Sequence, residues 1–306
     1  MIGPAGSGKG YIKQPLFDLL IKENIMKNEG VVECGIDDLV EADIEFQNKV
    51  TEYIKNNWTL DEIIFIENNT ENIINNIISP ASGNFDIVNK LNETATYLYD
   101  LYMKLREPHN KINDKTIINS LNELKNIRFE TTGMSNFDWL YKEFLTDNIR
   151  EKYNIVCVYP YVNDMTVLTQ ALTRFTIQAK KILDKKQTAP ARLPKIQELF
   201  NNITKIQNNY VNYLNQCIEN KNKIDYMIFY DNRQTTPKLV LNKICGSLSL
   251  DYKKSVSEFT DPSDNKNINI IKQNFIINKD KLGGKLSNHQ YIKYKTKYLK
   301  YKKIEI

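Results

Sequence analysis

The sequence is poor in the residues that build metal and redox sites. Among its 306 residues there are only two histidines and four cysteines. These six residues are His109, His289, Cys34, Cys157, Cys217 and Cys245. They form no CxxC pair and no cluster with the spacing of metal ligands, which excludes zinc-finger sites. Small buried cysteines behave as hydrophobic residues, so we expect four buried, reduced thiols.

Long apolar runs are also absent. No stretch approaches the roughly 18 apolar residues that span a bilayer, and the N-terminus lacks the charged and apolar regions of a secretory signal. From the sequence we therefore expect neither a transmembrane segment nor a secreted protein. We therefore expect an intracellular protein in a reducing compartment.

The excess of positive over negative charge is confined to the C-terminal end. The net charge is +5, yet six lysines lie between Lys293 and Lys303, so the body of the chain is close to neutral. A neutral body argues against an extended groove that follows a nucleic-acid backbone. Within 289–303 the tyrosines are spaced for one stripe of a basic helix. Such a tail could bind nucleic acid, an anionic membrane or an acidic partner, or be solvated without a ligand.

A phosphate-binding motif lies at the start of the chain. The segment Gly3-Pro4-Ala5-Gly6-Ser7-Gly8-Lys9 matches the GxxxxGK pattern, in which backbone amides surround phosphates and the lysine reaches the β and γ phosphates. The motif predicts ATP binding, followed by a helix over Tyr11–Lys27. Gly10 stands where the pattern has the Ser or Thr that holds Mg²⁺. Magnesium would then be held through water and acidic residues.

Four short apolar runs end in polar residues, which predicts an α/β fold of the P-loop NTPase type. A parallel sheet joined by crossover helices has this pattern. The runs are Val31–Ile36, Asn126–Phe129, Ile155–Val158 and Tyr226–Phe229. Their polar ends should gather beside the phosphate loop. Only Met1 and Ile2 precede the loop, so the usual first, central strand is missing: either the natural start lies upstream or the sheet has a gap at its middle.

The remaining segments predict three regions. Residues 1–250 form a P-loop kinase-like domain with a helical insertion at about 42–125, because Phe85–Arg106 and Asp114–Lys125 have helical periodicity. Leu193–Glu219 is a further helix expected to pack on the sheet. Residues 251–287 are rich in turn-forming residues and predict a polar linker. Residues 288–306 predict the basic tail helix.

Several of these segments together resemble the zeta-toxin-like P-loop kinases, particularly copies from giant DNA viruses. The matching segments are Gly3–Lys9, Gly35–Leu39, Phe129–Gly133, Tyr159–Val162, Arg174 and Ala191–Pro194. The resemblance covers about Ile2 to Asn232, and the tail resembles a lysine- and tyrosine-rich tail found on unrelated giant-virus proteins. It implies a location in the host cytoplasm, the viral factory or the virion.

The resemblance also implies roles for individual residues. Asp37 or Asp38 would be the general base, with Asp37 preferred; the competing role for one of them is a helix cap. Arg174 and Arg192 would neutralise the transferring phosphoryl group, against the alternative of surface ion pairs. Glu130 ends an apolar strand, as the acidic residue of a Walker B-like element does, and would bind the acceptor together with the hydroxyls of Thr131 and Thr132; the alternative is a helix-start signal before Asp138. Glu130 or Asp37 could also hold Mg²⁺ through water.

Three functions follow as hypotheses. The first is an ATP- and Mg²⁺-dependent kinase that phosphorylates a hydroxyl of a small molecule such as a nucleotide sugar. The second is a degenerate, non-catalytic nucleotide-binding protein whose tail serves viral assembly or localisation; Gly10 and the missing first strand favour it. The third is an enzyme acting on nucleic-acid ends, which the near-neutral body disfavours.

Overall fold

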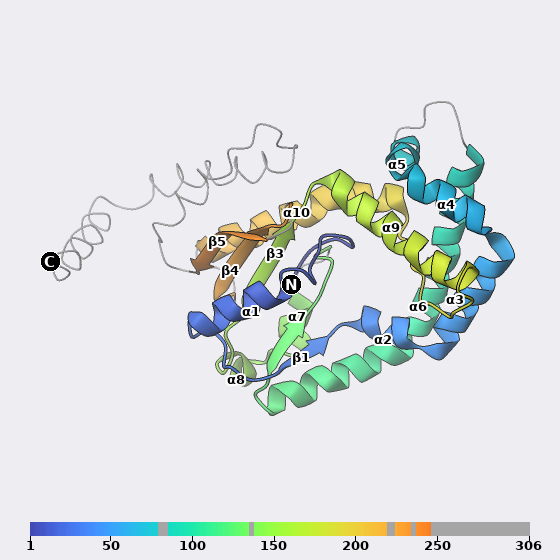
Figure 1. The fold of residues 1–306 in the computed structure, drawn as a ribbon. Helices are drawn as coiled ribbons and strands as arrows, with labels where there is room; N and C mark the ends of the chain where they lie inside the picture. Colours follow the sequence, from blue (N-terminus) through green and yellow to red (C-terminus); the bar gives the residue numbers. More distant parts are fainter. Residues whose placement is uncertain (79–84, 135–137, 219–223, 234–236, 246–306) are drawn as a thin grey trace, which may run out of the picture. The chain divides into compact units, whose positions relative to one another are not determined.

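A computed structural model describes residues 1–78, 85–134, 138–218, 224–233 and 237–245 (Figure 1). All of them belong to one compact unit, Met1–Asp251. The predicted linker at 251–287 and tail helix at 288–306 lie outside the described residues. The helices are α1 (Lys13–Lys22), α2 (Ile36–Ala42), α3 (Ile44–Asn57), α4 (Leu60–Asn68), α5 (Thr70–Ile78), α6 (Phe85–Asn122), α7 (Asp138–Glu143), α8 (Asp147–Arg150), α9 (Asp164–Leu183) and α10 (Ile196–Ile218). The strands are β1 (Val31–Cys34), β2 (Asn126–Phe129), β3 (Val156–Tyr161), β4 (Tyr226–Asp231) and β5 (Lys238–Ile244).

The strands form two small sheets. Strand β1 pairs with β2 in parallel, and β3 pairs with β4 in parallel. Strand β5 then runs antiparallel to β4. The four predicted strands are confirmed in a mixed α/β structure that is mostly helical, but the single parallel P-loop sheet is not shown by the described residues. Strand β5 was not predicted: its apolar run is only the three residues Leu239–Leu241, between Lys238 and Asn242, which is short for a strand signal.

The first residues of the chain hydrogen-bond to both sheets. The Ile2 amide donates to the Val158 carbonyl at 2.8 Å, and the Gly3 amide donates to the Thr131 carbonyl at 3.1 Å. The Thr131 amide in turn donates to the Met1 carbonyl at 3.0 Å. A single parallel bridge, Ile2 with Thr131, results. The predicted gap therefore contains residues 1–3, which contact both sides without forming a strand there.

Side-chain alternation explains how the β3–β4 sheet is covered. Val158, Ile228 and Tyr230 face α1 and pack against its buried Ile12 and Leu16. The intervening residues Tyr159 and Phe229 make tilted ring contacts with Tyr210 of α10, whose hydroxyl donates to the Ile228 carbonyl at 3.1 Å. Successive side chains of a strand point to opposite faces. Both faces are thus buried by helices, as the continuous apolar runs indicate.

The predicted insertion is a layer of helices. Helices α3, α4 and α5 contact α9, and their buried residues join one core with α6 and α10. The expected break between two helices in this region is wrong, because α6 is one helix of 38 residues with Pro108 inside it. Packing on both sides of the proline, through buried Leu105 and Ile117, outweighs its local cost. No helix of the described residues is long and apolar enough to span a membrane.

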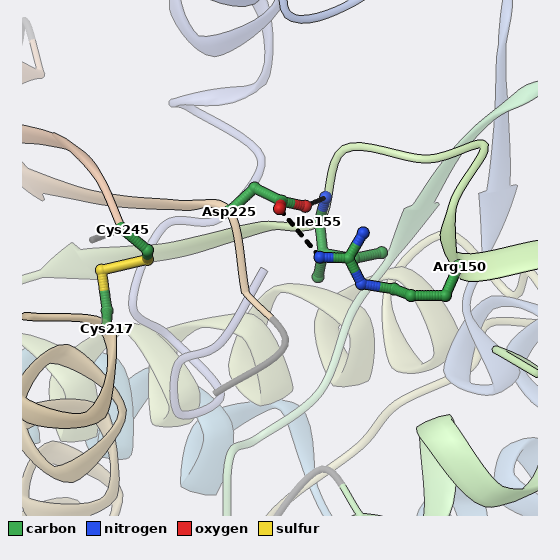
Figure 2. Close-up of a disulfide and its surroundings, with 5 residues drawn as sticks. All are labelled: Arg150, Ile155, Cys217, Asp225 and Cys245. Atoms are coloured by element: carbon green, nitrogen blue, oxygen red, sulfur yellow. Dashed lines mark hydrogen bonds and ion pairs between the residues drawn. A yellow bond between two sulfur atoms is a disulfide. The ribbon is translucent and has the colours of Figure 1, made fainter. Parts of the chain in front are cut away.

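A disulfide joins the end of α10 to the end of β5, contrary to the expectation of four reduced thiols (Figure 2). Cys217 and Cys245 are 28 residues apart in sequence, but their Cα atoms are 4.6 Å apart. Linear spacing could not reveal this, since the β4–β5 pairing brings Cys245 back to Asp225, whose carbonyl accepts from its amide at 2.7 Å. Cys34 and Cys157 are free and buried, as predicted. Burial raises the pKa of Cys157 to about 12.

Candidate functional site

The Gly3–Lys9 loop has backbone conformations that require glycine at two positions. Gly6 and Gly8 have φ angles of +80° and +73°. A Cβ atom on Gly6 would lie 2.5 Å from the Val167 carbonyl oxygen of α9, and one on Gly8 would lie 2.3 Å from the side-chain nitrogen of Asn232. The loop is therefore held closely between α9 and the residue that follows β4.

Several donors of this loop are without acceptors. The amides of Gly6, Gly8, Lys9 and Gly10 donate to no group in the described part of the chain. The Ser7 hydroxyl is also buried there without a hydrogen-bond partner. Consecutive unpaired amides in a turn form a concave site for an anion, and unsatisfied buried donors are costly. A phosphate group would satisfy these donors.

Asn232 supports the loop and was not assigned a role from the sequence. Its side-chain amide donates to the carbonyls of Ser7 at 3.1 Å and Gly8 at 3.3 Å. Its backbone amide donates to the Tyr161 carbonyl at 2.7 Å, which fixes it at the ends of β3 and β4. The available signal was its place directly after an apolar strand, where polar residues of a ligand crevice gather.

Lys9 lies folded against its own loop. Its Nζ donates to the carbonyls of Gly3 at 3.0 Å and Pro4 at 3.2 Å. Burial lowers the pKa of Lys9, while the nearby carboxylates of Glu130 and Asp37 act in the opposite direction. Lys9 is thus within electrostatic reach of the predicted base. Its contacts with two neutral carbonyls leave the ammonium charge uncompensated at close range.

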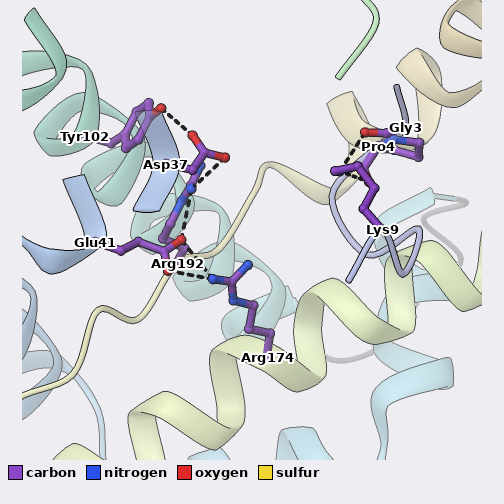
Figure 3. A network of polar contacts seen from close by, with 8 residues as sticks. All are labelled: Gly3, Pro4, Lys9, Asp37, Glu41, Tyr102, Arg174 and Arg192. Atoms are coloured by element: carbon purple, nitrogen blue, oxygen red, sulfur yellow. Dashed lines mark hydrogen bonds and ion pairs between the residues drawn. The ribbon is translucent and has the colours of Figure 1, made fainter. Parts of the chain in front are cut away.

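Asp37 is held at the start of α2 by two donors (Figure 3). The Tyr102 hydroxyl of α6 donates to one carboxylate oxygen at 2.5 Å, and Arg192 pairs with the other at 3.0 Å. Partial burial raises the pKa of Asp37, but Arg192 and these hydrogen bonds outweigh it and hold the pKa below its ordinary value. Asp37 is therefore an ionised carboxylate at neutral pH. Neither Asp37 nor Asp38 caps α2 through its side chain.

Glu41, one turn after Asp37, joins the two predicted arginines. Arg174 of α9 donates to both Glu41 carboxylate oxygens, at 2.9 and 2.6 Å. Arg192, in the segment between α9 and α10, donates to the same carboxylate at 3.1 Å and lies over the Tyr102 ring at 4.5 Å. Arg174 and Arg192 both form ion pairs, which was the alternative to a role in phosphoryl transfer. Figure 3 shows Arg192 between Asp37 and Glu41, with the Arg174 guanidinium on Glu41.

The other predicted residues have different places. Thr131 supports the loop through its backbone, and its hydroxyl accepts from the Gly133 amide at 3.2 Å. Glu130 pairs with Arg128 at 2.9 Å and lies within electrostatic reach of Lys9. Thr132 and Asp38 are exposed, without a hydrogen bond or ion pair to the described residues. Glu41 and Tyr102 were missed because their roles depend on contacts across the insertion.

The residues fit phosphate better than they fit a metal ion. No group of three or more His, Cys, Asp or Glu side chains in the described segments could hold a metal. Gly10 offers no hydroxyl, although a Cβ atom placed there would meet nothing within 4 Å. Helix α1 begins at Lys13 rather than directly after Lys9, so its N-terminus is displaced from the loop. A magnesium ion would need ligands from the nucleotide and water.

Comparison with known proteins was made for the whole chain. No family model, curated protein or solved structure matches it.

Proposed function

We propose that this chain is an ATP-dependent kinase of the zeta-toxin-like class, which transfers the γ-phosphoryl group to a hydroxyl of a small molecule. The observation that carries the proposal is the Gly3–Lys9 loop, whose amides at Gly6, Gly8, Lys9 and Gly10 and buried Ser7 hydroxyl have no acceptor or partner among the described residues. A phosphate cradle, a carboxylate and two guanidinium groups are the parts that phosphoryl transfer needs. The P-loop type of fold is part of this proposal.

In this mechanism each residue has one task. The amides of Gly6 and Gly8 and the Lys9 ammonium bind the β and γ phosphates, after Lys9 leaves the Gly3 and Pro4 carbonyls. The Asp37 carboxylate orients the acceptor hydroxyl and takes its proton. A new P–O bond then forms to the acceptor oxygen, while the bond between the γ-phosphorus and the β–γ bridging oxygen breaks and ADP leaves.

The arginines neutralise charge during transfer. Arg174 and Arg192 present planar guanidinium groups that match phosphate oxygens as they match the Glu41 carboxylate. Magnesium, when bound with the nucleotide, supplies further charge neutralisation at the β and γ oxygens. Asp37 or Glu130 could contact it through water.

A second function is favoured by Gly10. A loop that lacks the magnesium-binding hydroxyl can keep nucleotide affinity without turnover, and the protein would then be a non-catalytic nucleotide-binding module. In that case the proposed tail contacts, with an acidic partner, nucleic acid or a membrane surface, would carry the biological role.

Calorimetric titration with ATP, with and without Mg²⁺, tests the proposal. Wild type should bind, and Lys9→Ala should lose at least about tenfold in affinity, because an ammonium–phosphate contact is a charge-assisted one. Lys22→Ala, at the far end of α1, is the matched control. Acceptor screening with Asp37→Asn and Asp38→Asn then separates the functions: turnover abolished by Asp37→Asn supports the kinase. Binding without turnover supports the module, and absence of binding refutes both.

A further inference from the structure

One face of α6 presents three polar residues toward the segment that contains α2 and the start of α3. Tyr102, Arg106 and His109 are spaced by four and three positions, so they share this face. Tyr102 donates to Asp37 at 2.5 Å, and His109 contacts the Asp43 carboxylate at 2.9 Å. The two outer members therefore have acidic partners.

Arg106, the middle member, has none. Its guanidinium carbon lies 5.9 Å from the centre of the Tyr102 ring. Its Nε is buried without a hydrogen-bond partner, and no carboxylate of the described residues pairs with it. Unpaired buried donors are uncommon and costly in folded proteins. Arg106 thus carries a positive charge with which no carboxylate of the described residues forms an ion pair.

The position of Arg106 relates it to the proposed base. The Tyr102 ring lies near both guanidinium groups, with Arg192 at 4.5 Å and Arg106 at 5.9 Å, and its hydroxyl reaches Asp37. Arg192 is compensated by Asp37 and Glu41. Arg106 is the cation near this ring that is left to bind an anion from outside the chain.

We propose that Arg106 binds an anionic group of the acceptor, either a phosphate or a carboxylate. This is the same acceptor whose hydroxyl group Asp37 orients and deprotonates. This inference rests on the proposed kinase function and deepens it, since it assigns the acceptor to the negatively charged hydroxyl compounds. The guanidinium fork of Arg106 would hold the anion, as arginine does for planar or tetrahedral oxyanions. Tyr102 would hold Asp37 in place beside the hydroxyl.

The test uses inorganic phosphate as the probe. The purified chain is saturated with Mg²⁺ and a non-hydrolysable ATP analogue, which fills the Gly3–Lys9 loop, and is then titrated with phosphate by calorimetry. Wild type should bind one further phosphate. Arg106→Gln should weaken that binding at least about tenfold, the loss expected for a hydrogen bond to a charged group. Arg106→Lys should be intermediate, and Lys104→Gln, exposed on the same helix, should match wild type.

The outcomes separate the two proposals. Equal phosphate affinity of wild type and Arg106→Gln, or no further phosphate on wild type, overturns the acceptor site while nucleotide binding stands. If the analogue itself does not bind, the kinase proposal fails. The phosphate affinities of wild type and Arg106→Gln are then compared in the nucleotide-free chain, and this comparison tests anion binding by Arg106 alone. Glycerol 3-phosphate and glycerate in place of phosphate distinguish a phosphate-bearing from a carboxylate-bearing acceptor.

Discussion

Gly10→Ser should improve magnesium-dependent ATP binding. A Cβ atom at Gly10 would meet nothing within 4 Å, so the added side chain has no steric cost. Gly10 is also outside the set of glycines with positive φ, which among the described residues are Gly6, Gly8 and Gly133. A serine there should leave the free energy of unfolding unchanged or raise it by up to about 1 kcal/mol, through lower entropy of the unfolded chain.

The functional gain comes from the hydroxyl. Other phosphate loops place a Ser or Thr after the lysine to contact Mg²⁺. Because loss of a group that orients metal ligands typically costs ten- to a hundredfold, we expect Gly10→Ser to tighten Mg·ATP binding by about tenfold. Affinity for ATP without Mg²⁺ should stay within about twofold, since the added group acts through the ion.

Calorimetry of ATP binding with Mg²⁺ and with EDTA measures both quantities. Gly8→Ser is the matched control, because its Cβ would lie 2.3 Å from the Asn232 side-chain nitrogen and its φ is +73°. That variant should lose ATP affinity and thermal stability. If Gly10→Ser leaves the magnesium dependence unchanged while Gly8→Ser behaves as expected, the loop does not place position 10 near the metal, and the assignment of the phosphate site is wrong.

Further predictions concern the residues around the loop. Glu41→Gln should tighten ATP binding several-fold in calorimetry, because it removes the carboxylate that competes with phosphate for two arginines; weaker binding would refute this competition. Asn232→Ala should weaken ATP binding and lower the melting temperature, since two loop carbonyls lose their donor. Cys217→Ser should lower the free energy of unfolding in urea by about 3 to 4 kcal/mol, from the chain-entropy cost of a loop with 28-residue separation; wild type in reductant should behave alike, and equal stability of all three would refute it. Asp37 has a lowered folded pKa, so its ionised form stabilises the fold above the unfolded pKa and this contribution is lost as pH falls through the folded pKa. The stabilities of wild type and Asp37→Asn should therefore converge in acid, and a constant difference down to low pH would contradict the assignment.

Local sequence patterns predicted the elements but not how they combine. The four apolar runs specify β1 to β4 because a strand buried on both faces must be apolar over its whole length. The same pattern cannot tell whether neighbouring strands share one ladder, since that depends on hydrogen bonds such as those from Ile2 to Val158. It also cannot predict the disulfide, because the distance between Cys217 and Cys245 is set by the β4–β5 pairing.

In the candidate site, too, local sequence patterns predict some residues, whereas others depend on tertiary contacts. Gly6 and Gly8 could be predicted because their backbone conformations are encoded by the motif itself. The partners Glu41 and Tyr102 could not, since a glutamate one turn into a helix and a tyrosine within a helical repeat have no distinctive pattern. Tyr102 acts through the packing of α6 against α2, which brings it to Asp37, 65 positions away. Glu41 acts through Arg174 and Arg192, which are 133 and 151 positions away.

Charge balance gives an independent argument for an anionic ligand. The site contains four cations, Lys9, Arg106, Arg174 and Arg192. Asp37 and Glu41 are the carboxylates that pair with Arg174 and Arg192, and Glu130 lies within electrostatic reach of Lys9. Glu41 is shared by two arginines, so it cannot fully compensate both. Neighbouring positive charges repel one another, and an anion between them lowers this repulsion. An incoming triphosphate and an anionic acceptor would supply that missing charge, which explains how such a cluster can be maintained near a loop whose amides are themselves unpaired.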